Sequence, residues 1–119
     1  MSLRQFTNAY ITAALWSSVD EDGTPLDRLN AELAPKVRAR MEADCADFYA
    51  AHADSWTTAP DYGDGDAGHD FWLTRNRHGA GFWDRGLGDL GRTLTDAAHA
   101  YGECDLYVGD DGLIYTFPS

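Results

Sequence analysis

The stretch that decides the fold is GHDFWLTRNRHGAGFWDRG, residues 68–86. It holds four large aromatic side chains, two histidines and three arginines in nineteen positions. Apolar and polar residues alternate on both sides of a polar segment, and this alternation is typical of strands. The pattern therefore predicts a β-hairpin with strands over 70–75 and 80–85 and a loop over 76–79.

The register of this hairpin brings suitable side chains together. Leu73 lies opposite Phe82 on the face that we expect to pack on the helices, and Trp72 lies opposite Trp83 on the other face. Aromatic pairs across neighbouring strands stabilise a sheet. The second face is then either covered by helices or open to a partner.

Helices are predicted on both sides of the hairpin. Apolar residues recur at helical spacing over 3–17. Pro35 suits the first turn of a second helix, whose apolar face runs through Val37, Met41, Cys45 or Asp44, Phe48 and His52. A third helix is predicted over 88–101, with Asp89 as its N-cap and Gly102 at its end. The Gly- and Asp-rich segments 17–27 and 57–68 are predicted to be loops.

A second hairpin is predicted in ECDLYVGDDGLIYTF, residues 103–117. Asp111-Gly112 is a favoured two-residue turn. This turn places Leu106, Val108, Tyr115 and Phe117 on one face and Tyr107, Ile114 and Thr116 on the other. The expected fold is a single α+β domain over residues 1–119, in the order helix, helix, hairpin, helix, hairpin, with one four-stranded antiparallel sheet packed against helices.

The chain is strongly acidic: twenty acids face nine bases, giving a formal net charge of −11. Such a chain is repelled by nucleic acid and attracted to basic protein surfaces; the acids also serve solubility. The basic residues of the 75–92 region have acidic neighbours, and Asp70 is expected opposite Arg85 as a surface ion pair worth little energy.

Cys45 and Cys104 are expected to be reduced residues of a cytoplasmic protein in a bacterial host cell. The segment MSLRQFTNAYITAALW, residues 1–16, lacks the continuous apolar run of a signal peptide, and no run has the length of a membrane helix. We therefore expect no membrane partner.

Sequence motifs for catalysis or cofactor binding do not emerge. The histidines lack metal-site spacing, and the glycines lack the context of a phosphate-binding loop. The acidic stretch with Asp61, Asp64, Asp66 and Asp70 is either a weak cation site or a solvated loop. We expect no catalytic residue, metal or cofactor. One alternative is a small hydrolase, metal- or His/Asp-dependent, that uses His69, His78 and the 61–70 loop.

Several phrases of the chain resemble small acidic proteins of bacteriophages and mobile elements. They are AGHDFWLTRNRHGAGFWDRG, LYVGDDGLIY, ALWSSVDEDGTPLD and EADCADF, which together cover most of the chain. Small acidic proteins of mobile elements include anti-CRISPR and other anti-defence inhibitors, and DNA mimics. The resemblance brings no catalytic motif with it, and it is an association with a class of genes.

The leading hypothesis is a non-enzymatic, phage-type inhibitor that binds a host defence complex, such as a CRISPR effector with a basic nucleic-acid channel, and blocks nucleic-acid engagement. Acids would steer it to arginines, and exposed aromatic residues would anchor it. The candidate partner-binding residues are Asp20, Glu21, Asp22, Asp44, Asp47, Asp61, Asp64, Asp66, Trp72 and Trp83, with Tyr107 as a further anchor. A phage structural or housekeeping protein is the remaining alternative.

Overall fold

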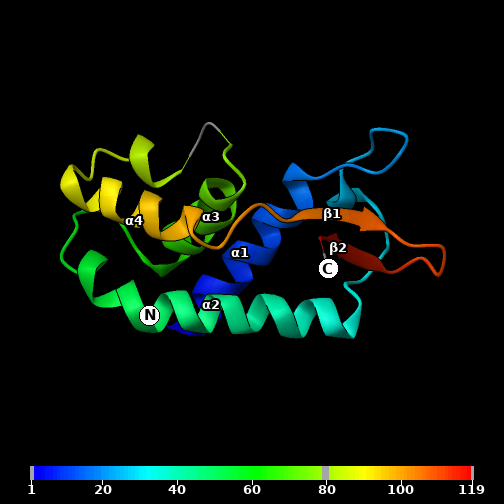
Figure 1. The fold of residues 1–119 in the computed structure, drawn as a ribbon, viewed down its shortest axis with the longest axis horizontal. Helices are drawn as coiled ribbons and strands as arrows, with labels where there is room; N and C mark the ends of the chain where they lie inside the picture. Colours follow the sequence, from blue (N-terminus) through cyan, green and yellow to red (C-terminus); the bar gives the residue numbers. More distant parts are fainter. Residues whose placement is uncertain (1, 79–80, 119) are drawn as a thin grey trace.

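The computed structural model describes residues 2–78 and 81–118, and helices dominate this part of the chain. Its elements are α1 (Leu3–Ser17), η1 (Leu26–Arg28), α2 (Pro35–Trp56), α3 (Asp64–Arg75), η2 (Phe82–Asp84), α4 (Asp89–His99), β1 (Asp105–Val108) and β2 (Ile114–Phe117). The molecule is elongated, with extents of 44 × 24 × 23 Å. In Figure 1, α2 runs along its length, α4 lies toward one end, and the β1–β2 hairpin projects at the other end with the segment that follows α1.

The predicted first hairpin is wrong. Residues 70–75 belong to helix α3, and residues 82–84 form the short 3₁₀ helix η2. Residues 79 and 80, the end of the predicted loop and the start of the predicted second strand, lie outside the described residues. The fold remains a mixture of helix and strand, but the predicted four-stranded sheet is replaced, in the described residues, by a sheet of two strands.

Burial explains why the hydrophobic pattern of residues 70–75 wrongly predicted a strand. Every residue from Asp70 to Arg75 is buried, so the second half of α3 is covered on all sides and shows no polar face. A helix of this kind has no helical hydrophobic period. Its aromatic and β-branched residues instead match the composition of a strand.

Local signals at both ends of α3 fit a helix. The Asp66 carboxylate accepts the backbone N–H of Gly63 at 2.9 Å, and an acid in the first turn suits the positive end of the helix dipole. At the other end Arg77 has φ +59°, with N–H bonds from Arg77 to Thr74 O and from His78 to Leu73 O. These two bonds form a Schellman cap. Residues 64–68, predicted as loop, are therefore the first turns of α3.

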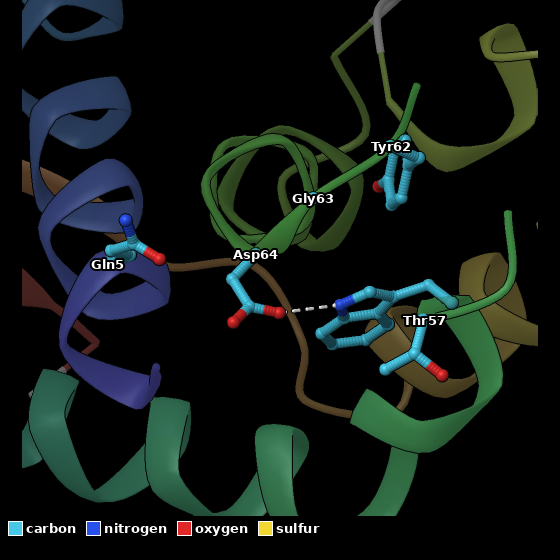
Figure 2. Close-up of a pocket in the computed structure, with 6 residues that line it drawn as sticks. Gln5, Thr57, Tyr62, Gly63 and Asp64 are labelled. Atoms are coloured by element: carbon cyan, nitrogen blue, oxygen red, sulfur yellow. Dashed lines mark hydrogen bonds between the residues drawn. The ribbon is translucent and has the colours of Figure 1, made fainter. Parts of the chain in front are cut away.

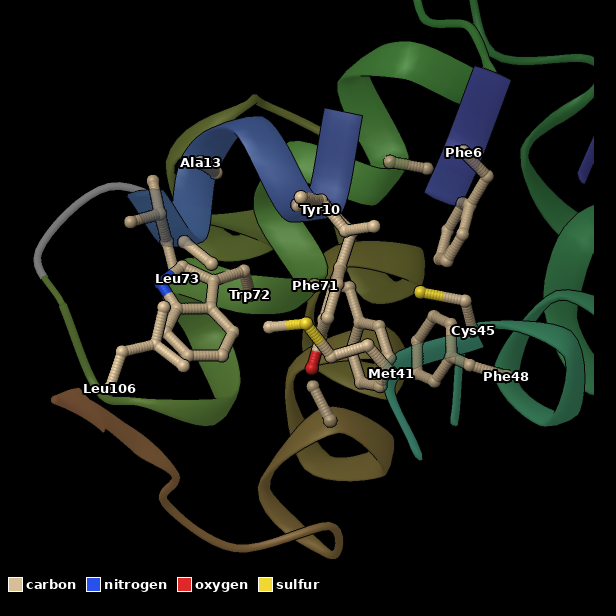
Figure 3. Close-up of a cluster of buried hydrophobic side chains, with 14 of the residues drawn as sticks. Phe6, Tyr10, Ala13, Met41, Cys45, Phe48, Phe71, Trp72, Leu73 and Leu106 are labelled. Carbon is tan, nitrogen blue, oxygen red and sulfur yellow. The ribbon is translucent and has the colours of Figure 1, made fainter. Parts of the chain in front are cut away.

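Small residues let α1 cross close to α3. Ala13, Ala14 and Ala67 are fully buried, and a Cβ added at Gly68 would collide with the backbone carbonyl of Phe6. Large aromatic side chains fill the space beside the crossing (Figure 3). Phe48 and Phe71 stack there with ring centroids 4.1 Å apart.

The three other helices confirm the helical spacing read from the sequence. α1 has the predicted bounds, α2 begins at Pro35, and α4 lies within the predicted 88–101. Asp89 is the first residue of α4 and Gly88, with φ +66°, is its N-cap, so the predicted cap is one residue late. Among the described residues, no helix combines the length and the apolar composition needed to cross a bilayer. Both thiols are free.

The second hairpin exists, but its predicted register is off by one residue. Tyr107 pairs with Tyr115 and Val108 with Ile114, because the turn contains three residues rather than two. Gly109 N–H bonds to Leu113 O at 2.8 Å, and Gly112 has φ +84°. This is the three-residue turn that ends in a left-handed residue. The one-residue shift buries Ile114 and turns Tyr115 outward.

Candidate functional site

An open groove of about 680 Å³ lies at the hairpin end of the molecule. One wall is the segment after α1, and the other is strand β1 with its turn; Figure 1 shows both at the same end. The groove is lined by Val19, Asp20, Glu21, Asp22, Leu29, Tyr107, Val108, Gly109 and Asp110. We call it the acidic groove. A second hollow of about 610 Å³ shares several of these residues and continues around the turn to Lys36, Asp111 and Tyr115.

The first wall is a tight turn held by its own backbone and by one carboxylate. Leu26 N–H bonds to Ser18 O and Asp20 N–H bonds to Thr24 O, both at 2.9 Å. The Oδ1 atom of Asp20 accepts the N–H groups of Asp22 and Thr24, each at 2.9 Å. Asp20 is therefore partly structural, and this turn presents the side chains of Glu21 and Asp22 to solvent.

The second wall carries an exposed aromatic pair. The rings of Tyr107 and Tyr115 stack with centroids 5.9 Å apart, and Tyr107 is 47% exposed. The Tyr115 hydroxyl donates to Asp111 at 2.6 Å, and Leu113 N–H donates to the same carboxylate. These two hydrogen bonds lower the pKa of Asp111 below its ordinary value, so this side chain stays ionised at neutral pH.

Negative charge dominates the acidic groove. Its lining includes Asp20, Glu21, Asp22 and Asp110, and no basic residue is among the described residues that line it. Within residues 2–78 and 81–118, none of these four carboxylates takes part in an ion pair. Lys36 lies at the outer hollow, 5.5 Å from the Tyr115 ring centroid. The groove therefore presents carboxylates that a cationic partner can reach.

Most of the other predicted acids hold the fold together. Asp44 accepts a hydrogen bond from buried Arg75 at 2.9 Å, and Asp47 accepts the Tyr101 hydroxyl. Asp66 binds the start of α3, as described above, whereas Asp61 is exposed with φ +57°. Of the three predicted acidic clusters, the one at 20–22 thus lines the acidic groove, and the other two are largely engaged elsewhere.

Asp64 lies in a separate hollow of about 420 Å³ beside the end of α2 (Figure 2). One carboxylate oxygen accepts the indole N–H of Trp56 at 2.9 Å. The other accepts the Tyr49 hydroxyl at 2.9 Å and the backbone N–H of Ser2 at 2.7 Å. Three donors occupy this buried carboxylate, so it joins α1, α2 and α3 rather than facing a ligand.

The two predicted tryptophan anchors have different positions. Trp72 is 2% exposed, and its indole N–H donates to Ser17 Oγ at 2.9 Å, so it belongs to the core. Trp83 is 57% exposed and lies over a hollow of about 250 Å³ that His78 and His99 also line. The hollow that Trp83 lines is separate from the acidic groove.

The two histidines of the hydrolase alternative have different surroundings. His69 Nδ1 is 3.1 Å from Asp70 Oδ1, and its ring stacks on Trp16. His78 lines the hollow beside Trp83, and the described residues that line this hollow include no carboxylate. Across the described ranges 2–78 and 81–118, no group of three or more His, Cys, Asp or Glu side chains is placed to hold a metal ion.

The groove also contains residues that the sequence did not single out as contact residues: Val19, Leu29, Val108, Gly109 and Asp110. Asp110 was expected beside the Asp111-Gly112 turn, opposite Leu113, and Val19 was expected in a loop. The available signal was the acid-rich turn DDG at 110–112, which resembles the acid-rich loop DEDG at 20–23. That both loops meet at one end depends on the tertiary fold.

Comparison with protein-family models, with curated proteins and with solved structures gave no match.

Proposed function

We propose that this chain is a non-enzymatic, phage-type inhibitor that binds a basic, nucleic-acid-binding surface of a host defence complex, in the manner of anti-CRISPR proteins. The observation that carries the proposal is the acidic groove: four carboxylates that form no ion pair within the described part of the chain, together with the half-exposed ring of Tyr107. Surfaces that hold nucleic acid are rich in Arg and Lys. A groove of carboxylates competes for the same cations.

Charge and aromatic area have separate tasks in this proposal. The net charge of −11 attracts a basic surface from a distance and raises the rate of encounter. Binding energy concentrates in a few aromatic anchors near the centre of an interface. Tyr107 suits this role because it lines the groove together with Val108 and the acids of the turn at 20–22.

Phage plaque formation on bacteria with an active CRISPR system tests the proposal. The chain is expressed in strains that carry different CRISPR types, and each strain is challenged with a phage that its system targets. Expression of the wild-type chain should restore plaques in at least one strain. A groove variant with Asp20→Asn, Glu21→Gln and Asp22→Asn should not.

A distal variant is the matched control. Asp54→Asn, Asp84→Asn and Asp96→Asn remove the same number of charges from exposed positions outside the groove lining. This variant should act like the wild type. If expression of the chain restores plaques in no strain, the chain is not an inhibitor of these systems, and a structural or housekeeping role takes the place of this proposal.

A further inference from the structure

Strand β1 has one unpaired edge. The sheet has two strands in the described residues. The outer edge of β2 is covered at Ile114, whose N–H bonds to Glu32 O and whose carbonyl accepts the N–H of Ala34, both at 2.9 Å. No strand of the described chain pairs with the opposite edge of β1.

The register shows which backbone groups this edge presents. Gly109 N–H bonds across the hairpin to Leu113 O, and bonded and non-bonded pairs alternate along antiparallel strands. Tyr107 is therefore in a bonded pair with Tyr115, and Val108 is in a non-bonded pair with Ile114. The N–H and C=O groups of Val108 point away from β2. Ile114, its partner, bonds outward in the same way on the other side.

The end of β1 that carries this edge lines the acidic groove. Val108 lines the groove together with the acids of residues 20–22 and Asp110. The same lining has apolar positions at Val19 and Leu29. An occupant that fits must offer a backbone in extended form, cationic side chains for the acids, and small apolar side chains between them.

We propose that the acidic groove binds an extended, basic peptide segment of the partner protein, which adds to the free edge of β1 as a further strand. This inference rests on the proposed function and specifies its binding mode. Main-chain hydrogen bonds to Val108 provide affinity, and Arg or Lys at alternate positions of the segment meet Glu21, Asp22 and Asp110. Charge complementarity selects this occupant.

A second copy of the chain fits the edge poorly. Pairing two β1 edges would bring two sets of groove carboxylates together, and like charges placed opposite each other oppose association. The same acids therefore protect an exposed edge from self-association while leaving it open to a basic strand.

The experiment uses a fluorescein-labelled peptide in which Arg and Val alternate, and anisotropy gives its Kd for the whole chain. A second peptide is identical but N-methylated throughout, so that it keeps its charges and lacks backbone donors. The variant Val108→Pro removes a donor that faces the groove without removing a β1–β2 bond. Amide NMR spectra show whether Tyr107 and Tyr115 remain paired in that variant.

The wild-type chain should bind the unmodified peptide and protect the Val108 amide from hydrogen exchange. Val108→Pro and N-methylation of the peptide should each weaken binding by about tenfold or more, because each change removes at least one main-chain hydrogen bond between the chain and the peptide. Comparable binding of the two peptides by the wild-type chain would overturn the strand-addition mode without using any variant.

The charge variants separate this inference from the proposed function. If the groove variant weakens binding while N-methylation does not, the groove attracts basic partners but strand addition is wrong. If neither change matters, both proposals fail. Self-association of the chain that Val108→Pro abolishes would assign the edge to a second copy and would also overturn the inference.

Discussion

Replacement of Arg85 tests the core of the fold, because the sequence and the structure predict different contributions of the Asp70–Arg85 ion pair to stability. The sequence predicts a surface ion pair between Asp70 and Arg85. In the structure Asp70 is 1% exposed. Arg85 donates to both of its carboxylate oxygens, at 2.9 and 3.0 Å, and the Tyr62 hydroxyl donates at 2.8 Å.

The structure sets the expected magnitude. Removing one partner of a buried ion pair costs about 3–5 kcal/mol, because the other charge is left without compensation. The Arg85 side chain is 36% exposed, which screens part of the interaction. Arg85→Met should therefore reduce the free energy of unfolding by about 3 kcal/mol, at the low end of that range. Tyr62 and His69 still contact the carboxylate.

Urea unfolding followed by tryptophan fluorescence measures this loss. Arg92→Met is the control, because Arg92 and Asp89 form an exposed pair at 3.5 Å and should contribute less than about 1 kcal/mol. Adding Asp70→Asn to Arg85→Met should recover part of the loss, since the buried charge is then gone. Equal unfolding midpoints for Arg85→Met and Arg92→Met would refute the buried pair and the placement of η2 against α3.

Three further measurements address packing and ionisation. Gly68→Ala should lower the free energy of unfolding by about 2–3 kcal/mol because its methyl group collides with α1, whereas Gly65→Ala, where a Cβ meets nothing within 4 Å, should not destabilise; equal urea midpoints would contradict the close crossing. Trp72→Ala should lower the free energy of unfolding by about 3–5 kcal/mol and Trp83→Ala by less than about 0.5 kcal/mol, as thermal unfolding measures it. The reverse order would show that Trp83 rather than Trp72 lies in the core. Burial raises the pKa of Cys45 from 9.0 to about 12, so the thiol ionises at lower pH in the unfolded chain than in the folded chain. The stability that the neutral, buried thiol contributes is complete below pH 9.0 and is lost as pH rises toward 12. An unchanged urea midpoint between about pH 8 and about pH 10.5 would contradict this burial.

The sequence predicts the amphipathic helices and misses the buried one. Helices α1 and α2 each have a polar face, so the helical period is visible in residues 3–17 and from Pro35 onward. α3 is surrounded by other elements, and its stretch DFWLTR has a composition that favours strands. The local signals that identify it, the acid at Asp66 and the cap at Arg77, are also compatible with loops.

The candidate site shows a similar division. The acids at 20–22 were predicted as contact residues because they have no arginine nearby in the sequence. Asp64 was chosen by the same argument, yet it is buried under Trp56, Tyr49 and Ser2. The sequence shows which charged residues have no oppositely charged neighbour nearby in the chain. It does not show the partners that distant elements bring to a residue such as Asp64 in the folded structure.

The association rates of the wild-type chain, the groove variant and the distal variant with a polyarginine peptide show whether the acidic groove is the binding site. Stopped-flow fluorescence at low and at physiological salt gives the three rates. We expect the groove variant to associate at least about fivefold more slowly than the wild type at low salt, and this difference to shrink as salt screens the charges. The distal variant should stay close to the wild type. Equal slowing of the two variants would show that net charge alone attracts the peptide, and would contradict the acidic groove as the binding site.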